Sequence, residues 1–165
     1  MIQVPVRYNG KIYLAGPFFN EEQIQVQTAV EDLCKKHERG VFSPRLECLI
    51  KKHDAMCVRR HAFTMNVLAI KEVRLVLANI EGLDSGTIWE MGAAYAYGTP
   101  VVAYSPDPTR ELNLMLAMGV SGYLAGLHLV DSFLEARSVE AIPGIPESYP
   151  DFNWEVVKPW HAEVF

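Results

Sequence analysis

The sequence predicts an α/β protein, a single doubly wound domain with a mainly parallel sheet of about five strands. Short aliphatic runs alternate along the chain with helix-length segments, which is the order that places helices on both faces of a parallel sheet. The run 75–80 is almost entirely aliphatic, as expected for a central strand that is buried on both faces. Because 50% of the 165 residues are hydrophobic, the chain can build one substantial core, and we expect one domain over residues 1–165.

The first strand is expected at 11–15, an apolar run that Gly16 and Pro17 close with a turn. Phe18 and Phe19 follow in the loop. Since this loop leaves the carboxyl end of a strand, its two aromatic side chains either cover the edge of the core or stack on a flat ligand. The residues alone leave both interpretations open.

The next segments predict a helix, a second strand and an irregular stretch. Asn20 and Gln23 stand at the spacing of a capping box, and apolar residues recur at helical intervals up to position 33. A short strand is expected at 41–43. Residues 45–57 mix charged and isolated apolar side chains, so we expect a loop or short helix over the site.

A helix is expected at 58–72, where small and apolar side chains suit packing against a sheet. Asn66 lies within this helix. Its amide either faces a ligand crevice or bonds to a neighbouring element inside the protein. The buried central strand 75–80 follows.

Residues 84–94, with the sequence DSGTIWEMGAA, predict a polar turn that leads into a helix. We expect Ser85 to be the N-cap, because its hydroxyl can accept from an unpaired N–H of the first turn, and Gly86 to let another group approach the backbone. Glu90 lies one turn later, where the helix dipole favours its charged form. Asp84 follows the strand at the edge where such folds bind ligands, so the two carboxylates share one crevice.

In the alternative interpretation of this motif, Asp84 and Ser85 only cap the helix and Glu90 faces water.

The remaining segments complete the predicted sheet. A strand is expected at 100–104 and a short helix at 112–118, and the last strand lies at either 120–124 or 126–130. Strands and helices that alternate at this spacing predict a flavodoxin-like arrangement. Residues 139–165 are rich in proline and aromatic side chains. We expect this tail to pack on its own domain or, as we favour, on a neighbouring subunit.

Composition excludes several classes of function. The formal net charge is −5 and no basic run occurs, so the surface that a nucleic acid polymer requires is missing. Three scattered cysteines and five histidines show no metal-ligand spacing, and we expect neither a disulfide framework nor a metal. No G-x-G-x-x-G or Walker sequence occurs, and we expect no cofactor. Without a signal peptide or a membrane-length apolar run, we expect a cytoplasmic protein that does not bind membranes.

Three pieces of sequence in a fixed order carry a resemblance to a known family. They are IYLAGP at 12–17, the stretch 77–92 with the DSGTIWEMG motif, and NLM at 113–115. Together they resemble the nucleoside 2-deoxyribosyltransferase family over about residues 11–122, and the middle piece is the most specific. The resemblance implies an enzyme of nucleotide salvage that transfers a 2-deoxyribosyl group between purine and pyrimidine bases, with 2′-deoxynucleosides and free nucleobases as substrates.

The resemblance also implies a role for each matching residue. Glu90 would be the nucleophile that attacks the anomeric carbon, Tyr13 would contact its carboxylate and tune it, and Asp84 would hold a sugar hydroxyl. The implied substrate-binding residues are Gly16, Pro17, Phe18, Phe19, Asn66, Ser85, Gly86, Asn113, Met115 and Phe165. Asn113 and Phe165 would come from an adjacent subunit, which implies a homo-oligomer built from dimers, up to a hexamer.

This assignment agrees with the chemistry of two carboxylates in one crevice. Substitution at an anomeric carbon passes through an oxocarbenium-like transition state, which a fixed carboxylate stabilises before it forms a covalent glycosyl-enzyme. A second base then attacks from the vacated side. Two inversions give retention of configuration, with ping-pong kinetics.

Two positions depart from the family pattern. Asn66 stands where some members have an aspartate that helps to protonate the departing base, and an amide cannot donate a proton as a carboxylic acid does. Either Asn66 only orients the base, or another residue or water is the acid. Arg74 stands where an aspartate is common, and we find no physical reason for it. We expect base choice to reside in 45–57, with Arg45 and Glu47 as candidates for contacts to the base edge.

Other functions fit the same residues less well. A nucleoside 5′-monophosphate N-glycosidase would use the same nucleophile, but its phosphate would need serine, arginine or backbone donors, whereas residues 113–115 suit a neutral hydroxyl. A phosphoribohydrolase that releases cytokinin bases is a more distant alternative, because the doubled glycine that wraps a phosphate is absent. The non-enzymatic alternative is a nucleotide-binding or interaction module.

Overall fold

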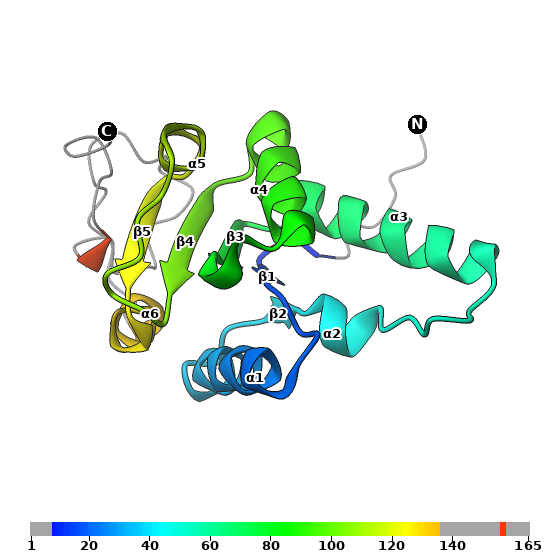
Figure 1. Ribbon diagram of the computed structural model, residues 1–165, viewed down its shortest axis with the longest axis horizontal. Helices are drawn as coiled ribbons and strands as arrows, with labels where there is room; N and C mark the ends of the chain where they lie inside the picture. The colour runs from blue at the N-terminus through cyan, green and yellow to red at the C-terminus, as the bar shows by residue number, and fades with distance from the viewer. Residues whose placement is uncertain (1–7, 136–155, 158–165) are drawn as a thin grey trace.

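The computed structural model confirms the predicted α/β fold and describes residues 8–135 and 156–157. Five parallel strands form one sheet in the order β2-β1-β3-β4-β5, with helices on both faces (Figure 1). The strands are β1 (Ile12–Ala15), β2 (Val41–Phe42), β3 (Leu75–Asn79), β4 (Val101–Ser105) and β5 (Gly122–Ala125). The helices are α1 (Glu21–Lys36), α2 (Pro44–Glu47), α3 (Met56–Glu72), the 3-10 helix η1 (Glu81–Leu83), α4 (Ser85–Tyr97), α5 (Leu114–Gly119) and α6 (Leu127–Glu135).

Each face of the sheet has its own apolar core. Side chains of a strand point alternately to opposite faces, so Val76 and Ala78 of β3 join one core while Leu75 and Leu77 join the other. The first core packs against α3, α4 and α5, and the second against α1 and α6 (Figure 1). Every residue of β3 is buried, as predicted for the central strand.

The strand order creates a switch point between β1 and β3. The chain leaves β1 toward β2 on one side, and it continues from β3 toward β4 on the other. In open α/β sheets, ligands bind outside the carboxyl ends of the strands at such a point. The loop after β1 and the turn after β3 both begin there.

The structure confirms the predicted capping box of α1 and decides where the last strand lies. The capping box of α1 is present, because Asn20 Oδ1 accepts from the N–H of Gln23 at 2.9 Å. Gln23 Oε1 accepts in return from the N–H of Phe19, also at 2.9 Å. The last strand lies at 122–125, so the alternative at 126–130 is wrong: α6 begins there. No helix within the described residues is long and apolar enough to cross a membrane.

Only two residues of the predicted tail belong to the described part of the chain. Val157 is buried in the core beside α1 and α6, and Val156 packs against the same cluster. The rest of 139–165, including Phe165, lies outside the described residues.

Gly16 fits closely against two buried side chains at the end of β1. A Cβ at this position would lie 2.9 Å from Gln27 Oε1 and 3.0 Å from Asn79 Cβ. Gln27 is buried, and its Oε1 accepts from the Tyr104 hydroxyl at 3.0 Å. The glutamine therefore cannot move aside without breaking a buried hydrogen bond.

We predict that Gly16→Ala lowers the free energy of unfolding by about 1–3 kcal/mol, because the added methyl group overpacks this contact. The matched control is Gly92→Ala in α4, where nothing in the described structure lies within 4 Å of the Cβ position. Alanine there should stabilise the helix by about 1 kcal/mol. Urea denaturation measures both variants, and equal stability of the two would contradict the packing argument.

Candidate active site

Glu90 of α4 and Tyr13 of β1 meet on the face of the sheet that α3 and α4 cover. The Tyr13 hydroxyl donates a hydrogen bond to Glu90 Oε1 at 2.6 Å. The Tyr13 ring is fully buried and stacks on Phe42 of β2, with the ring centroids 5.4 Å apart. The hydroxyl therefore has a fixed position, and it holds one of the two carboxylate oxygens.

Burial dominates the electrostatics of this pair. It raises the pKa of Glu90 from its ordinary 4.5 to about 7; the Tyr13 hydrogen bond lowers this pKa and the charge of Asp84 raises it. Burial and the Glu90 charge also raise the pKa of Tyr13, so the hydroxyl keeps its proton. Burial therefore opposes the charged form of Glu90 that the helix dipole was expected to favour, and a pKa of about 7 still leaves a charged fraction near neutral pH.

Asp84, and not Ser85, is the N-cap of α4. Asp84 Oδ2 accepts from the N–H of Thr87 at 2.8 Å and from the Thr87 hydroxyl at 3.0 Å. The backbone of Asp84 is still extended, at φ −56° and ψ 129°, whereas Ser85 is the first helical residue. Within the described residues the other carboxylate oxygen, Oδ1, makes no hydrogen bond.

Gly86 makes room for the capping carboxylate. A Cβ at this position would lie 3.0 Å from Asp84 Oδ2. The alternative interpretation of this motif, in which Asp84 and Ser85 only cap the helix, is right about Asp84. Glu90, however, turns to the buried Tyr13 and not outward to water.

Phe18 and Phe19 stack on each other at the carboxyl end of β1, with ring centroids 5.4 Å apart and an interplanar angle of 23°. The Phe19 side chain is 73% exposed, and Phe18 is half-buried. An aromatic ring that is mostly exposed does not cover the core. These contacts therefore favour the second interpretation, a surface on which a flat ligand stacks.

Asn66 lies on the inner face of α3, at helical spacing from the buried Ala62, Ala69 and Ile70. Its Oδ1 is buried and has no hydrogen-bond partner within the described structure. A buried acceptor without a partner costs free energy. The position thus suits a ligand N–H or a water molecule.

Arg45 is not available for the base edge, because its guanidinium is held by α1. It forms an ion pair with Glu31 and donates to the Thr28 hydroxyl at 3.1 Å. Ser43 donates to the same glutamate at 2.7 Å. These contacts fix the start of α2 on α1, and Glu47 at the end of α2 is exposed.

Cys48 lies near Tyr13, although no motif in the sequence predicts this position. This residue ends α2, packs against the core of the Tyr13 face, and lies close enough to Tyr13 to raise its pKa slightly. It follows a four-residue helix inside an irregular stretch, where no periodic pattern marks inward-facing positions.

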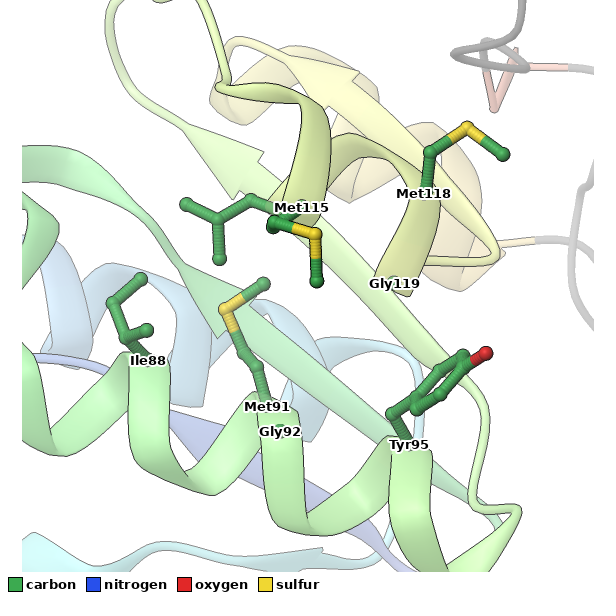
Figure 2. A pocket seen from close by; sticks show the side chains of 8 residues that line it. Ile88, Met91, Gly92, Tyr95, Met115, Met118 and Gly119 are labelled. Atoms are coloured by element: carbon green, nitrogen blue, oxygen red, sulfur yellow. The ribbon is translucent and has the colours of Figure 1, made fainter.

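Asn113 and Met115 lie at the start of α5. Asn113 is the N-cap, because its Oδ1 accepts from the N–H of Leu116 at 3.0 Å. Met115 borders an apolar pocket of about 290 Å³ between α5 and α4, where it points toward Met91 (Figure 2). The pocket is lined by Ile88, Met91, Gly92, Tyr95, Met115, Leu116, Met118 and Gly119.

Within the described residues, no group of three or more His, Cys, Asp and Glu side chains could hold a metal ion.

A family model and a solved structure place this chain in one family. The family described as nucleoside 2-deoxyribosyltransferase matches residues 12–133 of the chain. The structure of a 2-deoxyribosyltransferase from the psychrotolerant bacterium Bacillus psychrosaccharolyticus is similar, with a TM-score of 0.66 and 32% identity over 74% of this chain and 91% of that chain. A conserved protein from Enterococcus faecalis V583 gives a TM-score of 0.49 and 29% identity over 66% of this chain and 71% of that chain. No curated protein matches the sequence.

Because the pKa of Glu90 is raised in the folded protein, we expect the free energy of unfolding to depend on pH. Between pH 4.5 and about 7 the folded chain holds a proton on Glu90 that the unfolded chain has released, so stability falls as the pH rises through this window. Glu90→Gln keeps an oxygen for Tyr13 and removes the charge. We predict that this variant matches the parent near pH 4.5 and exceeds it by about 3 kcal/mol at pH 8.

Urea midpoints from pH 4.5 to 8 measure this difference, with Glu135→Gln at the exposed end of α6 as the control. A constant difference between Glu90→Gln and the parent across this range would contradict the raised pKa.

Proposed function

Because the chain belongs to the nucleoside 2-deoxyribosyltransferase family, we propose that it transfers a 2-deoxyribosyl group between purine or pyrimidine bases through a covalent intermediate on Glu90. Family membership makes it a deoxyribosyltransferase-type enzyme that acts on nucleosides and bases. The observation that carries the finer proposal is the hydrogen bond of 2.6 Å between the buried Tyr13 hydroxyl and Glu90 Oε1. It orients a carboxylate near the carboxyl edge of the sheet and leaves the second oxygen, Oε2, to react.

In the first half-reaction, Glu90 Oε2 forms a bond to the anomeric carbon while the bond from that carbon to the base nitrogen breaks. The electron pair of the broken bond leaves with the base, which takes up a proton. In the second half-reaction a nitrogen of the incoming base forms a bond to the same carbon and releases its proton to water, while the bond from that carbon to Glu90 Oε2 breaks and restores the carboxylate. Tyr13 stays protonated and donates to Oε1 throughout, so it holds the carboxylate in line.

The other side chains of the site bind the substrate. Asp84 caps α4 with Oδ2, and its Oδ1 accepts from a sugar hydroxyl. The stacked rings of Phe18 and Phe19 hold the base. Asn66 accepts an N–H of the base with its buried Oδ1, and the proton for the leaving base comes from water or another group.

Backbone and small side chains complete the pocket. Gly16 and Pro17 shape the loop after β1, and Ser85 and Gly86 line the start of α4. The proposal includes nucleotide salvage in the cytoplasm, without a cofactor, a metal, a nucleic acid polymer or a membrane.

We predict that the protein converts deoxyinosine and free adenine into deoxyadenosine, and that Glu90→Gln lowers this rate by several orders of magnitude, because an amide is no anionic nucleophile. Glu135→Gln should retain the parent rate. Chromatography of the nucleosides measures exchange. With a deoxynucleoside alone, about one equivalent of base per site should appear quickly, followed by slow turnover.

Two results would overturn this function. If the activity of Glu90→Gln were within about tenfold of the parent, Glu90 would not be the nucleophile. Base release at the same rate with and without an acceptor base would instead indicate a hydrolase of the N-glycosidase type.

We also propose that the active species is a homo-oligomer, in which Asn113 and Met115 reach the site of an adjacent subunit. The support is an exposed apolar patch on α4 and α5. Tyr95 is 67% exposed, Met115 79% and Met118 54% (Figure 2), and monomeric proteins rarely expose contiguous apolar patches of large size. The patch surrounds the pocket between the two helices.

We predict that Met115→Glu shifts the protein toward monomers in light scattering and lowers the exchange rate, because burying a carboxylate in an apolar interface is unfavourable. Ile24→Glu on α1, at the opposite face of the sheet and 38% exposed, is the control and should leave the assembly unchanged. A parent protein that is a fully active monomer would refute this assembly.

A further inference from the structure

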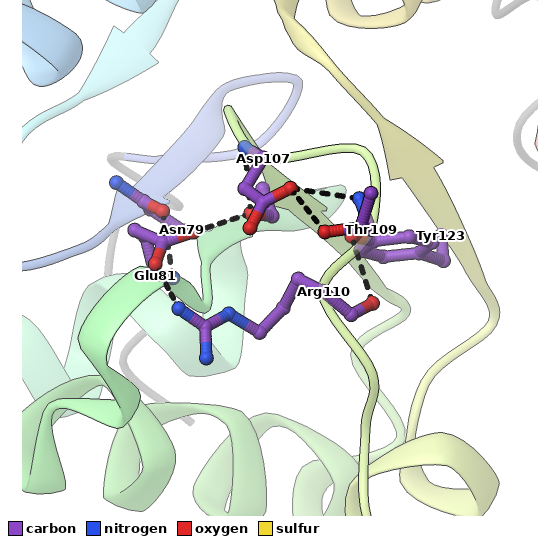
Figure 3. Close-up of polar contacts among 7 residues, drawn as sticks. Asn79, Glu81, Asp107, Thr109, Arg110 and Tyr123 are labelled. Atoms are coloured by element: carbon purple, nitrogen blue, oxygen red, sulfur yellow. Dashed lines mark hydrogen bonds and ion pairs between the residues drawn. The ribbon is translucent and has the colours of Figure 1, made fainter.

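A network of polar contacts joins the turn before α4 to the loop that leads to α5 (Figure 3). The carboxylate of Glu81 in η1 forms an ion pair with Arg110 and accepts from the Ser105 hydroxyl at 2.6 Å. The Ser105 hydroxyl oxygen accepts in turn from the N–H of Asp107 at 3.0 Å. One carboxylate therefore ties together the turn after β3, the end of β4 and the following loop.

The network is anchored on the sheet at both ends. Asn79, at the end of β3, accepts from the N–H of Glu81 at 3.0 Å, which fixes the turn that carries the carboxylate. Tyr123 of β5 donates to the carbonyl oxygen of Arg110 at 3.4 Å. Within the loop, Asp107 Oδ1 accepts from the N–H and the hydroxyl of Thr109 at 2.8 and 2.7 Å.

Glu81 and Arg110 form a charged pair that solvent screens only in part. Burial raises the pKa of Glu81, but the hydrogen bonds from Arg110 and Ser105 outweigh it and hold this pKa below its ordinary value. The two side chains are 34% and 32% exposed. Arg110 Nε is buried and has no acceptor within the described residues, so Glu81 is the group that holds the guanidinium.

Apolar packing fixes the loop and α5 only weakly. Between 106 and 119, the buried residues are Leu112 and Ala117. The helix has six residues, and the pocket of about 290 Å³ separates its methionines from α4 (Figure 2). The ion pair between Glu81 and Arg110 therefore restricts the position of the loop and of α5 more than their small contact with the core does.

We propose that Glu81 and Arg110 are positioning residues for the sugar end of the site, which rests on the function proposed above. Asp84 directly follows η1, and Asn113 stands three residues after Arg110 as the N-cap of α5. The ion pair thus fixes the turn that carries Asp84, which binds the sugar of its own site, relative to the loop that carries Asn113, which reaches the site of the adjacent subunit. Glu90 is held separately by Tyr13, so the chemical step does not depend on the pair.

The test is a double-mutant cycle with Arg110→Gln, Glu81→Gln and the double variant. Each single variant should raise the KM for the deoxynucleoside about tenfold and change kcat less than about threefold, because sugar binding weakens while the nucleophile stays in place. The double variant should be no worse than either single one, since all three lack the same interaction. The control is Asp131→Asn, which removes the ion pair to Lys36 and changes the hydrogen bond to His37 between α1 and α6 and should leave KM unchanged.

Hydrogen exchange gives a readout that does not need activity. The amides of 107–113 should exchange faster in all three variants than in the parent, while those of β4 should not change. Additive KM effects, an unchanged KM or unchanged exchange in this loop would overturn the proposal. A parent protein that transfers no deoxyribosyl group would contradict the proposed function instead, and hydrogen exchange would still test the link between the ion pair and the loop.

Discussion

The hydrogen bond from Tyr13 to Glu90 is the interaction on which the site depends. It requires that the strand carrying the tyrosine lies beside β3, because α4 follows β3 and covers the face to which Tyr13 points. A shift of one residue along β1 would turn the hydroxyl to the opposite face. Burial makes the Glu90 charge costly, and the hydroxyl offsets part of this cost. The sheet order thus sets both the place of the carboxylate and its protonation.

Much of the fold is predictable from the sequence because its signals are local. The central strand, the helices of 20–36 and 85–97 and the capping box of Asn20 follow from periodicity and from short polar motifs. The last strand was ambiguous, since a short apolar run does not distinguish a strand from a helix. Burial of Val130, Phe133 and Leu134 at helical spacing decides in favour of α6.

The site is predictable where one motif carries it and not where distant segments meet. The stretch 84–94 indicates two nearby carboxylates, but the choice of Asp84 over Ser85 as the cap depends on the backbone angles of one residue. The ion pair of Arg45 was not predicted, because its partner Glu31 is 14 positions earlier on another helix. The pKa of Glu90 depends on how deeply surrounding residues bury its carboxylate. The spacing of residues along a helix does not reveal this burial.

The contact between Gly16 and Gln27 links the choice of residue at two distant positions. Gln27 comes from α1, which covers the opposite face of the sheet from α4, and is held by Tyr104 of β4, yet its oxygen is the nearest atom to a Cβ added at Gly16. A side chain at position 16 therefore requires both a shorter residue 27 and more room beside Asn79. A redesign of this loop for a larger heterocycle therefore has to include residue 27 of α1.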